Sequence, residues 1–408
     1  MTIRLRPLAA LVIYALATAS PAAGQTLRSV TREAARRSAV ERAPRLLIAR
    51  SDTLAASAAV LASRLYLDPT ASLGYSRSTP RYHAEISLPI DLPWIRNART
   101  AAAQSGRLGS GLRLEFARAA ARLAADTAYT AALAARELLA LGRRNLSDAD
   151  SLLHIATIRR DAGDASDLDV ELARILSLQQ ANDHAVDSLR AEVSIFTLQA
   201  AMGLAVDTIT IVLADSLNRP SFDSVPSPMG VSLQVAAAQA DLRSAELAAR
   251  LQQSSRLLEP VLTAGFETGD PGGSENGLLP TIGLSIPLPL LNRNRGSVAL
   301  AEAEVQRAHS TLAAVQVETG AELGRARRAY DVALAQLDRD EVLVTAAERV
   351  STMSFIAYRE GAATLASVLE AQRTARDIRA QYVADLAGAW IAHDTFLLLT
   401  ATVDPSVP

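Results

Sequence analysis

Cysteine is absent from this chain of 408 residues. Its absence excludes disulfide bonds, thiolate metal sites, cysteine nucleophiles and lipid attachment at a mature N-terminal cysteine. The chain is therefore neither a disulfide-stapled secreted domain nor a lipoprotein. Lysine is also absent, which we attribute to a compositional bias rather than to function.

Aromatic residues are scarce, at 4% of the sequence, and the formal net charge is only −2. Ala, Leu, Arg and Glu dominate instead, a mixture typical of long helices and coiled coils. The balanced charge gives no reason to expect nucleic acid as a partner. We therefore expect a mainly α-helical protein that does not bind nucleic acid.

Residues that carry catalysis or hold metals are few and scattered. The 5 histidines have no second metal ligand at helical spacing, and the sequence contains no nucleophile-elbow motif. The carboxylates of the long helical segments mostly sit among arginines, as on a solvated helix face. We predict that the chain is not an enzyme, has no metal site and needs no cofactor.

Residues 1–24 have the pattern of a secretory signal peptide. Arg4 and Arg6 precede an apolar stretch at 8–17, and Ala22 and Gly24 are small residues just before a plausible cleavage site. An uncleaved membrane anchor is the alternative, but the stretch is shorter than the roughly 20 residues that span a bilayer. No later apolar run reaches that length, so we expect an exported chain without a transmembrane helix.

The sequence repeats itself once. Ser87 and Ser285 are 198 positions apart, and Gly163 and Gly361, which belong to a separate motif, have the same spacing of 198. Two motifs that share one offset indicate an internal duplication. We divide the chain beyond the signal peptide into a first repeat, a linker with some structure of its own, a second repeat and a tail, at 25–203, 204–229, 230–402 and 403–408.

Each repeat is expected to contain a helix, two short strands, a very long helix, a tight turn and a final helix. The helical segments fall at about 27–66, 96–158 and 166–203 in the first repeat and at about 231–257, 296–357 and 364–400 in the second. A helix of about 60 residues is roughly 90 Å long. Two such rods, each folded back at a turn, predict two protruding helical hairpins.

The second long segment carries a heptad pattern. Leu323, Tyr330, Leu337 and Val344 recur every seven residues, with alanines at the offset positions, which predicts close packing on a neighbouring helix. The first long segment instead begins with a cluster of glycines, Gly106, Gly109 and Gly111. A phosphate-binding loop is excluded because no strand leads into it and no lysine follows. We expect a kink or a close helix contact there.

Four segments alternate between apolar and polar residues. Apolar residues occupy every second position at 84–92 and at 282–290, and the shorter partners carry Ala71, Leu73 and Tyr75 or Leu262, Ala264 and Phe266. This pattern fits a barrel strand that is apolar towards lipid, but it also fits a soluble hairpin packed on a helix. The export signal and the polar loops favour the membrane.

Four strands are too few to close a transmembrane barrel, because open edges in lipid leave backbone groups unpaired. We therefore expect an obligate oligomer whose chains contribute four strands each to one shared barrel. Pro287 and Pro289 cannot donate ladder hydrogen bonds and should lie where strand passes into helix. A periplasmic coiled-coil scaffold is the alternative, but it gives the four strands no purpose.

This organisation resembles the TolC family of outer-membrane efflux proteins over essentially the whole mature chain. The resemblance is carried by SIPLPLLNRNRG at 285–296, its weaker copy SLPIDLPWIRNAR at 87–99, and the two turns GDASDLDV at 163–170 and YREGAATLASVLEAQ at 358–372. The run at 285–296 is similar to the branch of the family that exports heavy-metal cations, although drugs or a polypeptide stay open as cargo.

The resemblance implies a homotrimer with a β-barrel in the outer membrane and a helical barrel in the periplasm. It also implies two partners, a periplasmic adaptor protein and an inner-membrane efflux pump. The strand-to-helix junctions would then be formed by Pro89, Pro287, Pro289, Asn292, Arg293 and Gly296. The turns that contact the adaptor would be formed by Gly163, Ser166, Tyr358, Gly361 and Thr364.

In the family, acidic residues just after the turn narrow the channel entrance. Asp169 matches this position in the first turn, whereas the second turn has Ser367 there and Glu370 one helical turn further on. Asp161, Asp164 and Asp167 add to the same acidic patch. Carboxylates repeated by symmetry form a negative ring that favours cations.

Overall fold

The computed structural model describes residues 28–78, 80–204, 211–220, 230–254, 260–269, 277–287 and 294–402. The predicted signal peptide and tail lie outside these residues. In chain order the elements are β1 (Arg28–Val30), α1 (Arg32–Arg42), α2 (Pro44–Arg64), β2 (Thr70–Tyr75), β3 (Tyr82–Pro89), α3 (Pro93–Asp161), α4 (Asp167–Ala201), β4 (Ile211–Leu213), α5 (Leu233–Ser254), β5 (Val261–Thr268), β6 (Leu278–Ser285), α6 (Arg295–Arg359) and α7 (Leu365–Leu399).

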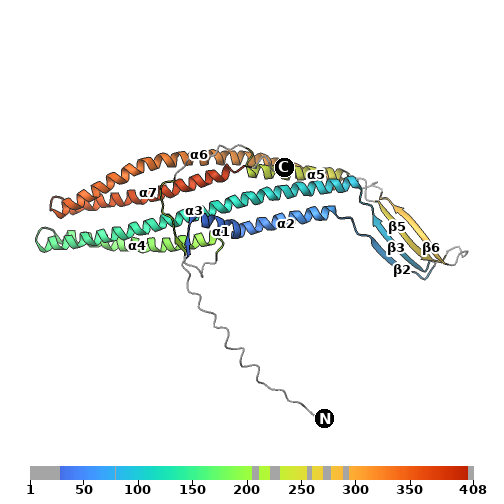
Figure 1. Ribbon diagram of the computed structural model, residues 1–408, viewed down its shortest axis with the longest axis horizontal. Helices are drawn as coiled ribbons and strands as arrows, with labels where there is room; N and C mark the ends of the chain where they lie inside the picture. Colours follow the sequence, from blue (N-terminus) through green and yellow to red (C-terminus); the bar gives the residue numbers. More distant parts are fainter. Residues whose placement is uncertain are drawn as a thin grey trace, which may run out of the picture.

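Two long helical hairpins dominate the molecule (Figure 1). α3 has 69 residues and pairs with α4, while α6 has 65 residues and pairs with α7. At 1.5 Å per residue each long helix extends about 100 Å. Both turns lie at one end of the molecule and the main sheet lies at the other, with α7 against α3 between the hairpins. The predicted long helices and their sharp turns are confirmed.

The heptad pattern of the second long segment marks the face of α6 that packs on its neighbours. Leu337 is fully buried, and Tyr330 is only 6% exposed. Ala326 and Ala347, at the offset positions of the same pattern, are buried as well. Small residues between larger ones let two helix backbones approach closely, as in a coiled coil.

The glycine cluster lies where α5 crosses α3. A Cβ atom on Gly109 would lie 2.7 Å from Oδ1 of Asp241 in α5, so a larger residue would force the Asp241 side chain to move. On the same seam, Ser105 Oγ donates to the Ala240 carbonyl at 3.0 Å and Ser244 Oγ donates to the Ala102 carbonyl at 3.0 Å. The expected close helix contact is confirmed.

The N-terminal region differs from the single helix expected at 27–66. Residues 28–30 form β1, which pairs in parallel with β4, and the helix is broken between α1 and α2. Pro44 causes the break, because it lacks an N–H and forces Ala43 into an extended conformation with ψ 129°.

Together α1 and α2 cover Arg32–Arg64, the one helical stretch among the described residues that is long and apolar enough to cross a membrane by composition. We had expected no such stretch. Its packing does not require a membrane, because α2 lies along α3 and buries Leu46 and Ser63 there.

The main sheet is antiparallel, with strand order β2-β3-β5-β6. β2 and β5 carry the apolar residues that the alternation placed in them. β3 and β6 end several residues earlier than expected, and residues 288–293 lie outside the described part. β3 ends early because the buried Asp91 carboxylate accepts from Arg99 at 2.8 Å and Pro93 starts α3.

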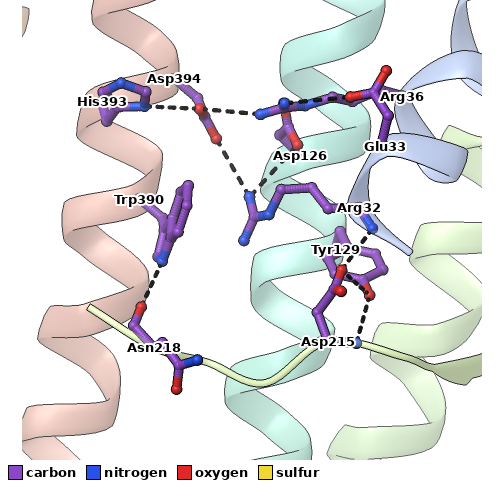
Figure 2. A network of polar contacts seen from close by, with 10 residues as sticks. All are labelled: Arg32, Glu33, Arg36, Asp126, Tyr129, Asp215, Asn218, Trp390, His393 and Asp394. Atoms are coloured by element: carbon purple, nitrogen blue, oxygen red, sulfur yellow. Dashed lines mark hydrogen bonds and ion pairs between the residues drawn. The ribbon is translucent and has the colours of Figure 1, made fainter. Parts of the chain in front are cut away.

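A buried polar network joins α1 to both hairpins near the middle of the shaft (Figure 2). The Arg36 guanidinium donates to Asp126 of α3 at 2.5 Å. Arg32 lies between Asp126 and Asp394 of α7, at 3.5 and 3.6 Å from their carboxylates, and stacks 4.0 Å from the Trp390 ring. Two arginines and two carboxylates thus hold three helices together.

The segment next to β4 completes this network. The Asp215 carboxylate accepts from the Arg32 backbone N–H at 2.8 Å and from the Tyr129 hydroxyl at 2.8 Å. Trp390 donates its indole N–H to the Asn218 carbonyl at 3.0 Å. Residues that are far apart in the sequence therefore fix the two hairpins relative to each other (Figure 2).

Burial and the neighbouring Asp394 carboxylate raise the pKa of Asp126 from 3.8 to about 6. The folded protein therefore binds this proton more tightly than the unfolded chain, and the contribution of Asp126 to stability is largest below pH 3.8 and is lost as the pH rises through about 6. We predict that Asp126→Asn flattens this part of the pH dependence of thermal unfolding, measured by circular dichroism. Asp52→Asn, on the exposed side of α2, should leave the profile unchanged.

Candidate functional site

The two hairpin turns share one backbone design. Gly163 and Gly361 both adopt positive φ, at 82° and 80°. In the first turn, the Gly163 N–H donates to the Arg160 carbonyl at 2.9 Å and the Asp164 N–H donates to the Arg159 carbonyl at 2.7 Å. The second turn repeats both bonds, from Gly361 to Tyr358 and from Ala362 to Ala357. This is the Schellman motif, which ends a helix with glycine in the left-handed region.

The helices that follow the turns begin with side-chain caps. Ser166 Oγ accepts from the Asp169 N–H at 3.2 Å, and the Asp169 carboxylate accepts from the Ser166 N–H at 3.0 Å. These reciprocal bonds form a capping box. In the second turn Thr364 accepts from the Ser367 N–H at 3.4 Å. Asp169 therefore holds the turn in shape, a role that the sequence analysis did not assign to it.

The two tips pack against each other through Arg159 and Tyr358. The Arg159 guanidinium donates to the Tyr358 carbonyl at 2.8 Å and lies 4.8 Å from the centre of its ring. The Tyr358 side chain is 2% exposed, within an apolar cluster that includes Leu152, Val170 and Val368, and burial raises its pKa. Arg159 was missed by the sequence analysis, although a basic residue in the last helical turn is a recognised signal.

The remaining acidic residues lie on the solvent side of the tips. Asp161, Asp164 and Asp167 are exposed around the first turn, and Asp161 pairs with Arg160 at 2.5 Å. Glu370 is exposed in the second turn of α7. The structure thus brings the predicted carboxylates to one end of the shaft.

The strand-to-helix junctions lie at the opposite end. Pro89 is the last residue of β3, and the Ile90 N–H donates to the Pro260 carbonyl at 2.8 Å. Pro287 follows the end of β6 and is exposed, and Gly296 lies in the first turn of α6. Pro289, Asn292 and Arg293 lie outside the described residues.

The main sheet has the polarity of a membrane protein. Opposite residues on antiparallel strands share a face, and the register places Ile86 beside Ala264 and Ala264 beside Ile282. This apolar face is uncovered, with Ile282 85% exposed. The alternate residues form the other face, on which Glu85 and Thr263 of the two inner strands are only half exposed. Within the described part of the chain, the outer strands β2 and β6 each have one edge without a strand partner.

Among the described residues no three histidine or acidic side chains are grouped so that they could hold a metal ion. The features that could act on a ligand are thus the exposed acidic tips and the two-sided sheet. They lie at opposite ends of a shaft about 100 Å long.

The turn geometry makes glycine necessary at both tips. We predict that Gly163→Ala or Gly361→Ala destabilises the protein by about 1–2 kcal/mol, because positive φ is unfavourable for residues with a Cβ atom. Gly320→Ala is the matched control. It lies on the exposed face inside α6 with nothing within 4 Å, so it should be neutral or stabilising by up to about 1 kcal/mol. Denaturant unfolding followed by circular dichroism measures both.

Comparisons with known proteins agree with this geometry. Residues 231–393 match the family model for outer membrane efflux proteins. Over 336 residues the chain is 25% identical to the cobalt-zinc-cadmium resistance protein CzcC of Cupriavidus metallidurans, covering 78% of this chain and 77% of that protein. It is 28% identical to the pyoverdine export outer membrane protein OpmQ of Pseudomonas putida, but it spans only 55% of that protein.

Solved structures share the fold. The CmeC outer membrane channel of Campylobacter jejuni superposes with a TM-score of 0.78 at 16% identity, covering 90% of this chain and 85% of CmeC. A membrane protein from Pseudomonas aeruginosa gives the same TM-score of 0.78 at 19% identity, covering 93% of this chain and 98% of that protein. The match of residues 231–393 to this family, together with the relatives and the shared fold, identifies the chain as an outer-membrane efflux channel similar to the TolC family, with its hairpin shaft in the periplasm.

Proposed function

We propose that three copies of this chain close into one tube that passes substrate from a periplasmic adaptor and an inner-membrane pump to the exterior. Three sheets of four strands supply a twelve-stranded barrel in the lipid. The shaft supplies four helices per chain at each level, and hence a helical barrel of twelve. The observation that carries the proposal is a pair of exposed, mostly apolar seams on the outer helices α4 and α6; polar residues interrupt both seams.

The α4 seam lies on a side of the helix that does not face α3. Its residues alternate in steps of four and three, and all are exposed: Leu168, Leu172, Ile175, Gln179, Asn182, Val186, Leu189, Val193 and Phe196. The side that faces α3 carries other residues, among them Val170, Ala173 and Leu176, which are buried. A heptad seam in solvent is a surface that another helix covers.

The α6 seam matches it. Its residues also follow three-and-four spacing and are all exposed: Val332, Ala335, Arg339, Val342, Ala346, Arg349, Met353 and Ile356. α4 and α6 are the two outermost helices of the shaft (Figure 1). In chain direction, α4 runs away from the tips and α6 runs towards them. We infer that α4 of one chain packs on α6 of the next.

The sheet supports the same arrangement. Its free edges, β2 and β6, can pair only with strands of other chains, and lipid leaves no alternative partner for those backbone groups. Closure in this way turns the exposed apolar face outward and the polar face inward. Tyr75 and Tyr82, whose rings are 5.2 Å apart, lie at one end of this face, as in an interfacial aromatic girdle.

At the tips we assign the entrance to Asp169 and Glu370, with Asp161, Asp164 and Asp167 around it. The adaptor would contact Gly163, Ser166, Gly361 and Thr364, which are exposed. Tyr358 is buried, so we assign it the support of the turn from beneath rather than direct contact.

For the cargo we propose heavy-metal cations. The relative named for cobalt-zinc-cadmium resistance matches 78% of the chain, whereas the one named for pyoverdine export matches 61%. Acidic tips suit cations on electrostatic grounds. We also propose that the predicted division into two repeats holds, with each repeat supplying one helical hairpin and two strands.

Light scattering of the protein extracted from outer membranes in detergent tests the trimer. The mass expected is that of three chains, and Val186→Glu, within the α4 seam, should lower it because a charge would be buried between chains. Ala185→Glu, next to the seam and also exposed, is the matched control and should remain trimeric. A monomeric protein recovered from the soluble periplasm would instead support the coiled-coil scaffold.

Conductance across a planar lipid bilayer tests the entrance. Under a potassium chloride gradient, Asp169→Asn together with Glu370→Gln should lower the ratio of cation to anion permeability, since a negative ring loses its charge. Asparagine keeps an acceptor oxygen for the Ser166 cap, so the turn should survive. Glu304→Gln is the control, because Glu304 lies near the N-terminal end of α6, far from the tips. An unchanged ratio in the double variant would remove these two residues from the entrance.

A further inference from the structure

The polar face of the main sheet carries two carboxylates among mostly small side chains, and the Ser87 hydroxyl donates to the Glu85 carboxylate at 3.0 Å. Most of its side chains are small, such as Ser72, Thr263, Thr281 and the hydrogen atom of Gly283. Two long acidic side chains stand out from it, Glu85 on β3 and Glu267 on β5. Their backbone positions are diagonal neighbours, since Glu267 pairs with His83 and Glu85 pairs with Gly265.

Arginine is absent from this face in the described strands, which leaves His83 as its one basic side chain. The His83 ring lies across Gly74 of β2, where an added Cβ atom would come within 2.2 Å of it. β2 and β5 flank β3 on opposite sides, so the ring leans away from Glu267.

On the two inner strands, this face is also the more enclosed side of the sheet around the two carboxylates. Glu85, Ser87 and Glu267 are half-buried, whereas Ile86 and Phe266, which point to the opposite side, are 57% and 55% exposed. A soluble sheet would show the reverse. The carboxylates are therefore on the side that becomes the barrel interior.

We propose that Glu85 and Glu267 form a second negatively charged zone, in the barrel, which makes the exit of the channel selective for cations. This inference rests on the trimeric channel proposed above and deepens it. Two carboxylates per chain give six in the closed barrel, at the opposite end of the shaft from the acidic tips.

The size of the barrel makes the effect physically significant. Twelve strands spaced about 4.8 Å apart and tilted by about 40° give a backbone radius of about 12 Å. Glutamate side chains extend inward from that wall, so their charges lie within about one Debye length of the axis, which is roughly 8 Å in 0.15 M salt. The selectivity should therefore be strong at low salt and largely screened at 1 M.

The test is the zero-current potential of the full-length channel in a planar bilayer, with potassium chloride at low concentration on both sides and a gradient between them. Glu85→Gln with Glu267→Gln should lower the cation-to-anion permeability ratio several-fold, and the difference from the unmodified channel should disappear near 1 M salt. Glu85→Asp with Glu267→Asp keeps the charges and should keep the selectivity. Glu302→Gln, on α6 in the shaft, is the control.

The outcomes separate this inference from the proposed function. If the unmodified protein is trimeric and conducts, but the double glutamine variant has the same permeability ratio at low salt, the barrel zone is wrong and the trimeric channel stands. If the unmodified protein neither assembles nor conducts, the proposed function fails first. If the double variant does not assemble, each single glutamine variant is measured instead, and a smaller decrease in the cation-to-anion permeability ratio is expected. An unchanged ratio in both single variants would again overturn the proposed charged zone in the barrel.

Discussion

The backbone N–H and C=O groups along the outer edges of β2 and β6 constrain every other part of this molecule. In water an open edge is tolerable, but in lipid each unpaired group costs several kcal/mol. In the trimeric channel proposed above, these edges are joined to strands of other chains, and the sheet turns its apolar side to the lipid. The helical shaft also has uncovered sides, because its two outer helices, α4 and α6, expose mostly apolar seams to solvent. In the proposed trimer, one chain is therefore one part of a tube wall that the neighbouring chains complete.

Much of this wall can be predicted from the sequence because its elements are set by local patterns. The seven-residue spacing of Tyr330 and Leu337 fixes which face of α6 is buried, and the glycines at 163 and 361 fix where the hairpins turn. Alternation likewise identified all four strands of the main sheet. Capping chemistry next to a turn is also local, and the Ser166–Asp169 capping box was readable, although Asp169 was assigned only to the entrance.

What escaped prediction depends on contacts between distant residues. β1 is three residues long and exists because β4, some 180 positions later, pairs with it. The early end of β3 follows from the buried pair of Asp91 and Arg99 rather than from any change in alternation. The network around Arg32 and Asp126 unites three helices that no periodicity connects. Such buried charges are costly to desolvate, so their value here lies in fixing the geometry between hairpins.

The seams on α4 and α6 have a genetic consequence. In the proposed trimer each seam belongs to one chain and is covered by the next, so a chain with a damaged seam destabilises the ring that it joins. In a cell that makes normal and altered chains in equal amounts, only about one in eight three-chain rings lacks an altered subunit. Substitutions such as those at Val186 should therefore act dominantly if the altered chain still enters the ring, and recessively if it is excluded from it.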